Sequence, residues 1–165
     1  MTESLSHRYY LLALSAAERV DLSGAVRLAR WALMLDSEHE NARRLLGLCL
    51  YEQGALQAAV EVLAAFPDLA AQAREADEQT QTALEQIKEQ ADCGNWRKAL
   101  RTAQRIPHQS ARLVNIQGCL LAGAKRYRKA GERFARTLET DRGSAAAMEY
   151  LLEAAKRPQS IWEML

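Results

Sequence analysis

The sequence contains few residues that interrupt a helix. Only 3 Pro and 8 Gly occur among its 165 residues, while the good helix formers Leu, Ala, Glu, Arg and Gln are abundant. Aromatic residues make up 6%, but hydrophobic residues as a whole reach 48% and charged residues 26%. That composition is typical of a folded chain rather than a disordered one. We therefore expect a folded and mainly helical protein.

The sequence also lacks the features of exported or membrane-spanning chains. No uninterrupted apolar run approaches the ~18 residues that a spanning helix needs. The first residues show no basic start and no apolar run with a cleavage site, which argues against secretion. The three cysteines, Cys49, Cys93 and Cys119, are odd in number and lie in or beside helical patterns, so we expect reduced thiols and a cytoplasmic location.

Charge of one sign does not predominate over the whole chain. The net charge is +1, from 22 Lys and Arg against 21 Asp and Glu, and a duplex-binding domain usually has a clear basic excess. Nucleic acid is therefore not an expected partner. Two basic segments, Trp96–Arg105 and Lys125–Lys129, could contact RNA or an acidic protein. The balanced total favours solvated helix faces for both.

Motifs for catalysis are missing as well. His7, His39 and His108 are far apart, and no histidine or cysteine spacing typical of a metal site occurs. Neither a phosphate-binding glycine loop nor a nucleophile elbow is found. The simplest interpretation of the cysteines is small core residues. We expect no enzyme, no cofactor and no metal.

The strongest positive signal is an internal repeat. Four small residues align after turn-like junctions, at spacings of 34, 40 and 31: Ala25, Ala59, Ala99 and Ala130. Three residues before each stands a bulky one: Leu22, Leu56, Trp96 and Tyr127. Twelve residues before each stands a small one in three blocks, with Ile87 as the exception: Ala13, Gly47 and Gly118. Helix pairs need small side chains where their backbones approach and large ones around them.

Blocks two and four carry the most specific version of the pattern. The residues are Arg43-x2-Leu46-Gly47-x2-Leu50 with Ala59-x3-Leu63, and Val114-x2-Gln117-Gly118-x2-Leu121 with Ala130-x3-Phe134. This pattern resembles the tetratricopeptide repeat (TPR) family. The resemblance implies an all-α fold, a right-handed α–α superhelix (solenoid) of about four TPR-like helix pairs plus a C-terminal capping helix.

The expected organisation is one solenoid domain over residues 1–165. The repeats cover about 6–39, 40–67, 68–109 and 110–143, followed by a capping helix and tail over 144–165. The expected helices are His7–Arg19, Leu22–Asp36, Glu38–Gln53, Leu56–Phe66, Trp96–Arg105, Ser110–Ala124, Tyr127–Thr140 and Ser144–Lys156. Asp21 is the expected N-cap of the second helix, Ser37-x-x-Glu40 is read as a capping box for the third, and Pro67 is expected to end the fourth.

The segment Asp68–Asp92 contains no Gly or Pro and keeps one apolar face. We expect one unusually long helix there, since helix breakers are absent. The alternative is a short helix, a loop near Asp77 and then a second helix.

The resemblance also implies a binding surface, because the first helix of each pair lines the concave side of such a solenoid. The helical register then selects the candidate residues Tyr10, Leu14, Asn41, Arg44, Leu48, Tyr51, Leu84, Lys88, Arg112 and Asn115. Some family members grip a C-terminal carboxylate with basic residues on these helices. The nearest positions here are not basic: Tyr10, Leu14, Leu45, Gln81 and Glu85. A more apolar extended or helical ligand is therefore preferred.

The function expected from these features is a protein–protein adaptor or scaffold of unknown partner, without membrane contact. Two alternatives stay open: a small cytosolic TPR chaperone for a secreted or assembling substrate, and a self-assembling scaffold. The latter would form a homo-oligomer through the C-terminal tail, with Ile161, Trp162 and Leu165 as a possible motif. The tail could equally fold back and cover the last helix pair.

Overall fold

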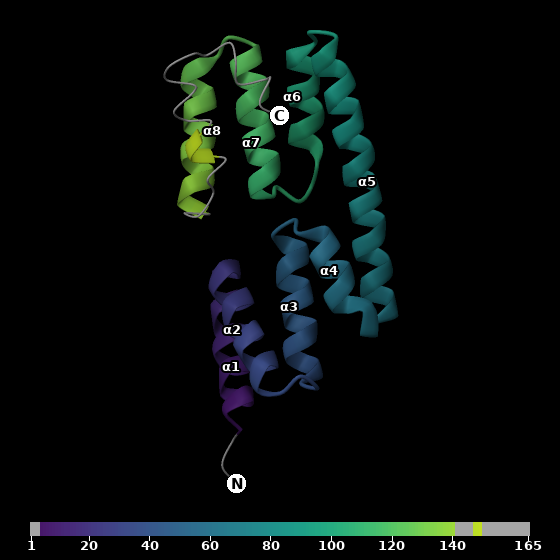
Figure 1. Cartoon of the computed structure of the whole chain (residues 1–165), viewed down its shortest axis with the longest axis vertical. Coiled ribbons are helices and arrows are strands. Elements are labelled where there is room, and N and C mark those ends of the chain that lie inside the picture. The colour runs from purple at the N-terminus through teal and green to yellow at the C-terminus, as the bar shows by residue number, and fades with distance from the viewer. Residues whose placement is uncertain (1–3, 141–146, 150–165) are drawn as a thin grey trace. The chain divides into compact units, whose positions relative to one another are not determined.

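The computed structural model describes residues 4–140 and 147–149, and these residues form helices joined by short turns, with no strand (Figure 1). The all-α prediction is confirmed. The chain divides into two compact units, residues 1–79 and 80–165. Of the expected capping helix Ser144–Lys156, residues 147–149 are described and are helical. The proposed tail motif Ile161, Trp162 and Leu165 lies outside the described residues.

Unit 1 is a succession of antiparallel helices. Its elements are α1 (Leu5–Glu18), α2 (Leu22–Leu35), α3 (Glu40–Glu52), α4 (Leu56–Val62), the 3-10 helix η1 (Leu63–Ala65) and the first half of α5 (Pro67–Asp92). In Figure 1, α3 lies between the α1–α2 hairpin and α4. The α1–α2 and α3–α4 turns are short because a left-handed residue reverses the chain, Val20 at φ 63° and Gly54 at φ 75° respectively.

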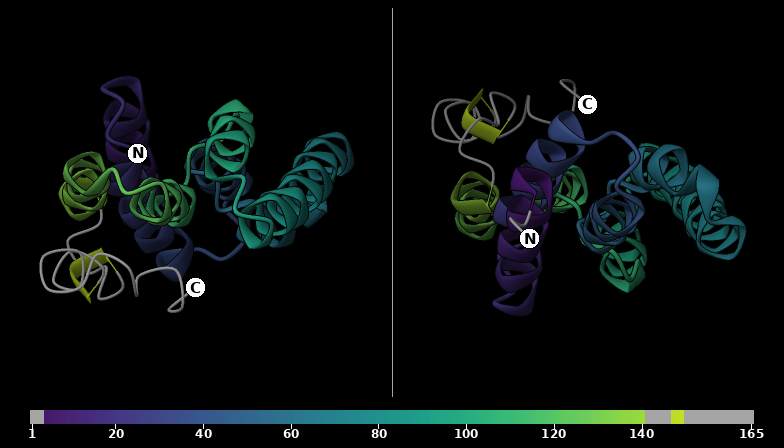
Figure 2. Two further views of the ribbon diagram at one scale, coloured as in Figure 1. Left: turned by 90° about the horizontal axis from the view of Figure 1, so that it is seen from above. Right: turned by 90° about the horizontal axis from the view of Figure 1, so that it is seen from below.

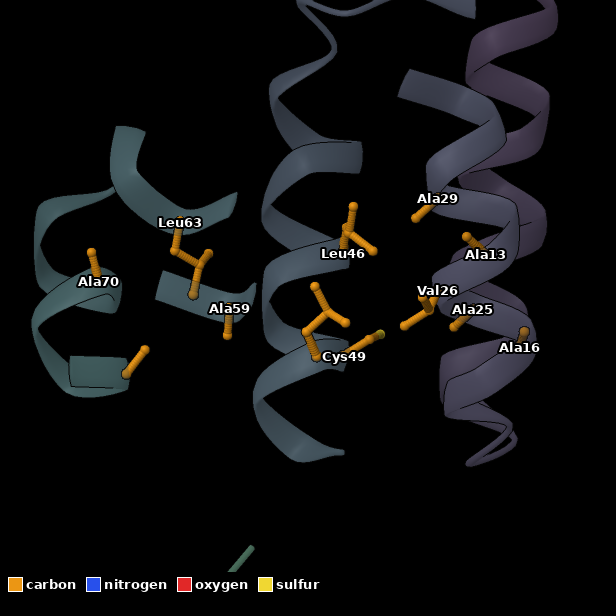
Figure 3. Packing of buried hydrophobic residues seen from close by; sticks show 12 residues of the cluster. Ala13, Ala16, Ala25, Val26, Ala29, Leu46, Cys49, Ala59, Leu63 and Ala70 are labelled. Carbon is orange, nitrogen blue, oxygen red and sulfur yellow. The ribbon is translucent and has the colours of Figure 1, made fainter. Parts of the chain in front are cut away.

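The core of unit 1 follows the repeat. The aligned residues Ala25 and Ala59 have no exposed surface, and Figure 3 shows them facing the neighbouring helices. A Cβ on Gly47 would lie 2.4 Å from Leu63, so glycine is what allows α3 to approach this turn of the chain. The small position of block two thus packs on the residue four places after its aligned alanine.

Unit 2 repeats this packing. It contains the second half of α5, α6 (Trp96–Arg105), α7 (Ala111–Gly123) and α8 (Tyr127–Thr140), and α7 lies between α6 and α8 in the end-on views of Figure 2. A Cβ on Gly118 would lie 2.5 Å from the Phe134 ring, and Phe134 is fully buried. Ala99 and Ala130 are fully buried too.

Block three breaks the small-residue rule in a way that the packing explains. Ile87 stands where the other blocks have Ala or Gly, and the position four residues after its aligned alanine is Ala103. Both are buried in the same cluster, with 2% and 0% exposure. The large residue is on the first helix and the small one on the second, so the pair fills a similar volume with its sizes exchanged.

The helix boundaries match the sequence in most places. Asp21 caps α2 by accepting the Gly24 N–H at 2.9 Å, as expected, and α6 and α8 have the expected limits. The capping box of Ser37 and Glu40 is wrong. The helix α3 begins two residues later, and the N-cap is His39, whose Nδ1 accepts the Ala42 N–H at 3.2 Å.

The long central helix is confirmed. α5 runs without interruption from Pro67 to Asp92, a length of 26 residues. The preceding helix ends earlier than the expected stop at Pro67, since α4 ends at Val62 and the 3-10 helix η1 at Ala65. Pro67 opens α5 as its first residue, where its missing N–H costs no hydrogen bond. The alternative with a loop near Asp77 is excluded.

Candidate functional site

Three of the side chains on α1 lie on one face at helical spacing. His7, Tyr10 and Leu14 follow one another at i, i+3 and i+7, and all three are half-buried. Ala13 and Ala16, outside this face, are buried in the core of unit 1. The α1 face therefore shows two rings and a leucine that are partly open to solvent.

An aromatic cluster joins this face to the start of α3. The His7 and His39 rings stack at 6.0 Å between centroids, and Tyr10 lies 5.1 Å from His39 and 5.8 Å from His7. Nδ1 of His39 accepts a hydrogen bond from the Ala42 N–H at 3.2 Å, which holds the ring at the start of α3. His39 was missing from the sequence-based candidates, and its place just before a helix was the only signal that could have suggested it.

The next candidates continue along the solvent side of α3. Asn41, Arg44 and Leu48 are exposed and Tyr51 is half-buried. The other side of α3 is buried in the core of unit 1. Together with the α1 face and His39, these residues define what we call the α1–α3 surface: His7, Tyr10, Leu14, His39, Asn41, Arg44, Leu48 and Tyr51.

The remaining candidates lie in unit 2 and are less uniform. Lys88 on α5 and Arg112 on α7 are exposed, while Leu84 is half-buried against the core around Ile87. Asn115 does not point to solvent as expected, since it is only 7% exposed and its Oδ1 has no hydrogen-bond partner. Helical register predicts which residues share a face, but it cannot tell whether that face is covered.

A second exposed feature of unit 1 was not anticipated. The α1–α2 hairpin carries Leu5, Leu12, Trp31 and Leu35, each between 48% and 57% exposed. Tyr9 stacks on Trp31 at 6.4 Å and links the two helices. Leu5, Tyr9 and Leu12 share a face of α1 that differs from the one carrying Tyr10 and Leu14. The sequence signal was an α1 that is apolar on more than one side.

The charge distribution differs sharply between the units. Residues 1–79 contain 7 Lys and Arg against 12 Asp and Glu, a net charge of −5. Residues 80–165 contain 15 against 9, a net charge of +6. The balanced total of the whole chain therefore hides one acidic and one basic region.

Potential metal ligands and thiols are the reactive groups of interest among the described residues. The described residues contain no group of three or more His, Cys, Asp and Glu side chains placed to hold a metal ion. Burial raises the pKa of the Cys119 thiol to about 12. Burial, and then the Glu52 carboxylate, also raises the pKa of Cys49. Both thiols are thus poor nucleophiles, and the core interpretation of these two cysteines is confirmed by their burial.

No described helix has both the length and the apolar character needed to cross a bilayer. A scan against protein-family models gives no match for the chain, and a search of curated proteins gives none either.

Proposed function

We propose that the chain is a protein-binding module without catalytic activity, and that the α1–α3 surface is part of its contact area. The composition of that surface supports this most directly. It combines partly exposed rings and leucines with one exposed guanidinium, and aromatic side chains with Arg are enriched in protein interfaces. Purely solvated helix faces would be dominated by charged residues instead.

The partner that fits is a peptide or helix with apolar side chains. Leu48 of α3 is 37% exposed and Leu11 of α1 is 42% exposed, so both leave apolar surface in contact with water until a partner covers it. Arg44 forms no ion pair or hydrogen bond in the described part of the chain. Its guanidinium can therefore donate to a carboxylate or carbonyl of the partner.

The finer architecture belongs to the same proposal. We infer that the hairpins are tetratricopeptide-like repeats of one right-handed solenoid, with an adaptor or scaffold role in the cytoplasm. The close approach of Gly47 to Leu63 and of Gly118 to Phe134 supports this, because two blocks use the same pair of positions for the same contact. A repeated contact at equivalent positions is typical of stacked repeats.

The test is affinity capture followed by quantitative mass spectrometry with matched variants. Arg44→Ala with Leu48→Ala removes two exposed side chains of the α1–α3 surface. Gln57→Ala with Glu61→Ala, two exposed positions on α4, serves as the control. If these residues are interface anchors, each truncation to Ala costs about 2 kcal/mol of binding free energy. Each truncation then weakens binding roughly 30-fold.

The expected result is a set of proteins captured by the parent chain and by the α4 control but lost with the surface variant. Circular dichroism must show unchanged helix content in both variants. Capture of the same proteins by all three chains would place the binding site elsewhere. Capture of no protein by the parent chain would contradict the proposal itself.

A further inference from the structure

The basic region of unit 2 is concentrated in its last three helices. Residues 93–138 contain 11 Lys and Arg and a single acidic residue, Glu132. Ten of the 11 basic side chains are exposed and Arg133 is half-buried. These 46 residues therefore carry a local net charge of +10, whereas unit 2 as a whole (residues 80–165) carries +6, so the positive charge is concentrated in this part of the unit.

The helical register places the charges of α6 and α8 on the sides of these helices that face away from the core, and Lys125 and Arg126 lie in the turn before α8. Both helices bury their small residues and Phe134 against neighbouring helices, so the basic positions face away from the core. Arg97, Arg101 and Arg105 follow at i, i+4 and i+8, which separates them by about 6 Å each along α6. We call the following set the α6–α8 basic surface: Arg97, Lys98, Arg101, Arg105, Lys125, Arg126, Arg128 and Lys129.

Almost none of this charge is neutralised by the protein. In the part of the chain that the structure describes, the only ion pair of this surface joins Arg128 to Glu132 at 3.6 Å, and both side chains are well exposed. Arg97, Lys98 and Arg101 make no ion pair in the same part of the chain. Their side chains therefore remain available to an external anion.

The two helices begin with the same basic arrangement. Trp96-Arg97-Lys98-Ala99 opens α6 and Tyr127-Arg128-Lys129-Ala130 opens α8, and neither first turn contains an acidic residue. Cations in the first turn oppose the helix dipole, which favours anions there. Both helices carry this unfavourable arrangement of cations at equivalent positions, and a bound polyanion would stabilise it.

We propose that the α6–α8 basic surface binds the sugar-phosphate backbone of a nucleic acid strand. Eight of the 11 basic residues are Arg, whose planar guanidinium matches a phosphate in two hydrogen bonds. The helices α6, α7 and α8 expose no large apolar side chain among their described residues, because such side chains lie on the turns and helices before residue 49 and at Met148. Protein interfaces usually centre on aromatic or apolar anchors and membrane-bound helices usually bury apolar side chains, whereas a phosphate backbone is held mainly by charge.

This site is separate from the α1–α3 surface and does not depend on the proposed function. The expected recognition is independent of base sequence, because phosphate contacts position a strand without reading its bases. Binding must fall steeply with salt. For a single strand, the logarithm of the binding constant falls with the logarithm of salt by about 0.7 for each phosphate contact.

The experiment is fluorescence anisotropy with the full chain and a labelled oligouridine RNA of about 20 nucleotides, with oligothymidine DNA of the same length as the second arm. Arg97→Gln, Arg101→Gln and Arg105→Gln are combined in one α6 variant. Arg27→Gln, Arg30→Gln and Arg74→Gln form the control, since these are exposed arginines of unit 1 with the same change in net charge. Gln keeps a high helix propensity in both variants.

The parent chain and the control are expected to bind at least one of the two strands, and the α6 variant to bind about tenfold more weakly or worse, with a salt dependence flatter by about 2. The two arms show whether the strand is RNA, DNA or either. A second variant, Arg126→Gln with Lys129→Gln, tests the turn and α8 independently, should the α6 variant lose helix content.

Three results would overturn the proposal. The first is no binding of either strand at about 50 mM salt. The second is equal weakening in the α6 variant and in the control. The third is binding of poly-glutamate or of vesicles with anionic lipid as tightly as the strands, with the same loss in the variants, because that would show attraction to any polyanion.

Discussion

The three thiols differ in their surroundings, and this difference predicts their reactivity. Cys93 is exposed at the end of α5, while Cys49 and Cys119 are buried. Because the thiolate is the reactive form, a raised pKa and burial both slow reaction. We expect one thiol per chain to react rapidly with an aromatic disulfide reagent at about pH 8, and the other two only when the protein unfolds.

The measurement is the number of thiols released with time, with and without denaturant. Cys93→Ser should remove the rapid phase completely. Rapid reaction of two or three thiols in the folded chain would contradict the burial of Cys49 and Cys119.

The neutral Cys119 thiol also predicts how the stability of the protein depends on pH. Its pKa is raised from 9.0 to about 12 in the folded protein, so its contribution to stability is complete below pH 9.0 and is lost as pH rises toward about 12.

Single residues also show where sequence reasoning ends. The register of α3 correctly left Asn41, Arg44 and Leu48 in solvent, because the buried side of that helix is apolar and unambiguous. The register of α7 failed for Asn115, because α7 is apolar on several sides and its burial depends on three-dimensional packing. The prediction of Ser37 as the N-cap of α3 was wrong for a similar reason. Both Ser37 and His39 can accept a backbone N–H, and only the path of the turn decides between them.

At the scale of helices, the repeat predicts a contact between Gly118 and Phe134. This contact predicts that a larger residue at position 118 destabilises the protein. Gly118 lies in the middle of α7, where Ala would normally stabilise a helix by about 1 kcal/mol over Gly. A Cβ at this position would lie within 3 Å of three atoms of the Phe134 ring. We therefore expect Gly118→Ala to destabilise the protein by about 1–3 kcal/mol.

Denaturation by urea, followed by circular dichroism, measures this change. Phe134→Leu in the Gly118→Ala background should recover part of the lost stability, since the smaller side chain leaves room for the new methyl group. The coupling between the two substitutions in a double-mutant cycle identifies the contact as the cause. A stabilising Gly118→Ala would mean that helix propensity outweighs the contact and that α7 and α8 can separate without cost.

The presence of each helix was easier to predict than the residues at which it ends, although the limits of two helices could be predicted. The limits of α6 and α8 follow from strong local signals: a turn, an aromatic residue in the first position and an amphipathic pattern. The length of α5 follows from the absence of Gly and Pro. By contrast, the last turn of the fourth predicted helix is the 3-10 helix η1, a change of hydrogen bonding that no residue type announces.

At the scale of the whole molecule, the total charge averages over two units of opposite net charge. The net charge of the whole chain is +1, whereas unit 1 (residues 1–79) has a net charge of −5 and unit 2 (residues 80–165) one of +6. The sequence contained both numbers, and only the structure gives the boundary at which to count them. Charge patterning is therefore informative for each folded unit rather than for a chain.

The two units also have separate cores, and this predicts separate unfolding. One cluster of buried residues ends at Ala73, and the other two lie between Ile87 and Phe134. The middle of α5, from Arg74 to Thr82, contributes to none of them. Leu63→Ala should cost about 2–5 kcal/mol in unit 1, and Phe134→Ala about 3–5 kcal/mol in unit 2, through the cavities they create.

Hydrogen exchange followed by mass spectrometry resolves the two effects by peptide. Leu63→Ala should speed exchange in α1–α4 and leave α6–α8 near the rates of the parent chain, while Phe134→Ala should do the opposite, because local opening follows the stability of each cooperative unit. Faster exchange in all helices with either variant would show that the cores unfold as one. In that case α5 would transmit stability through its middle segment despite the lack of buried residues there.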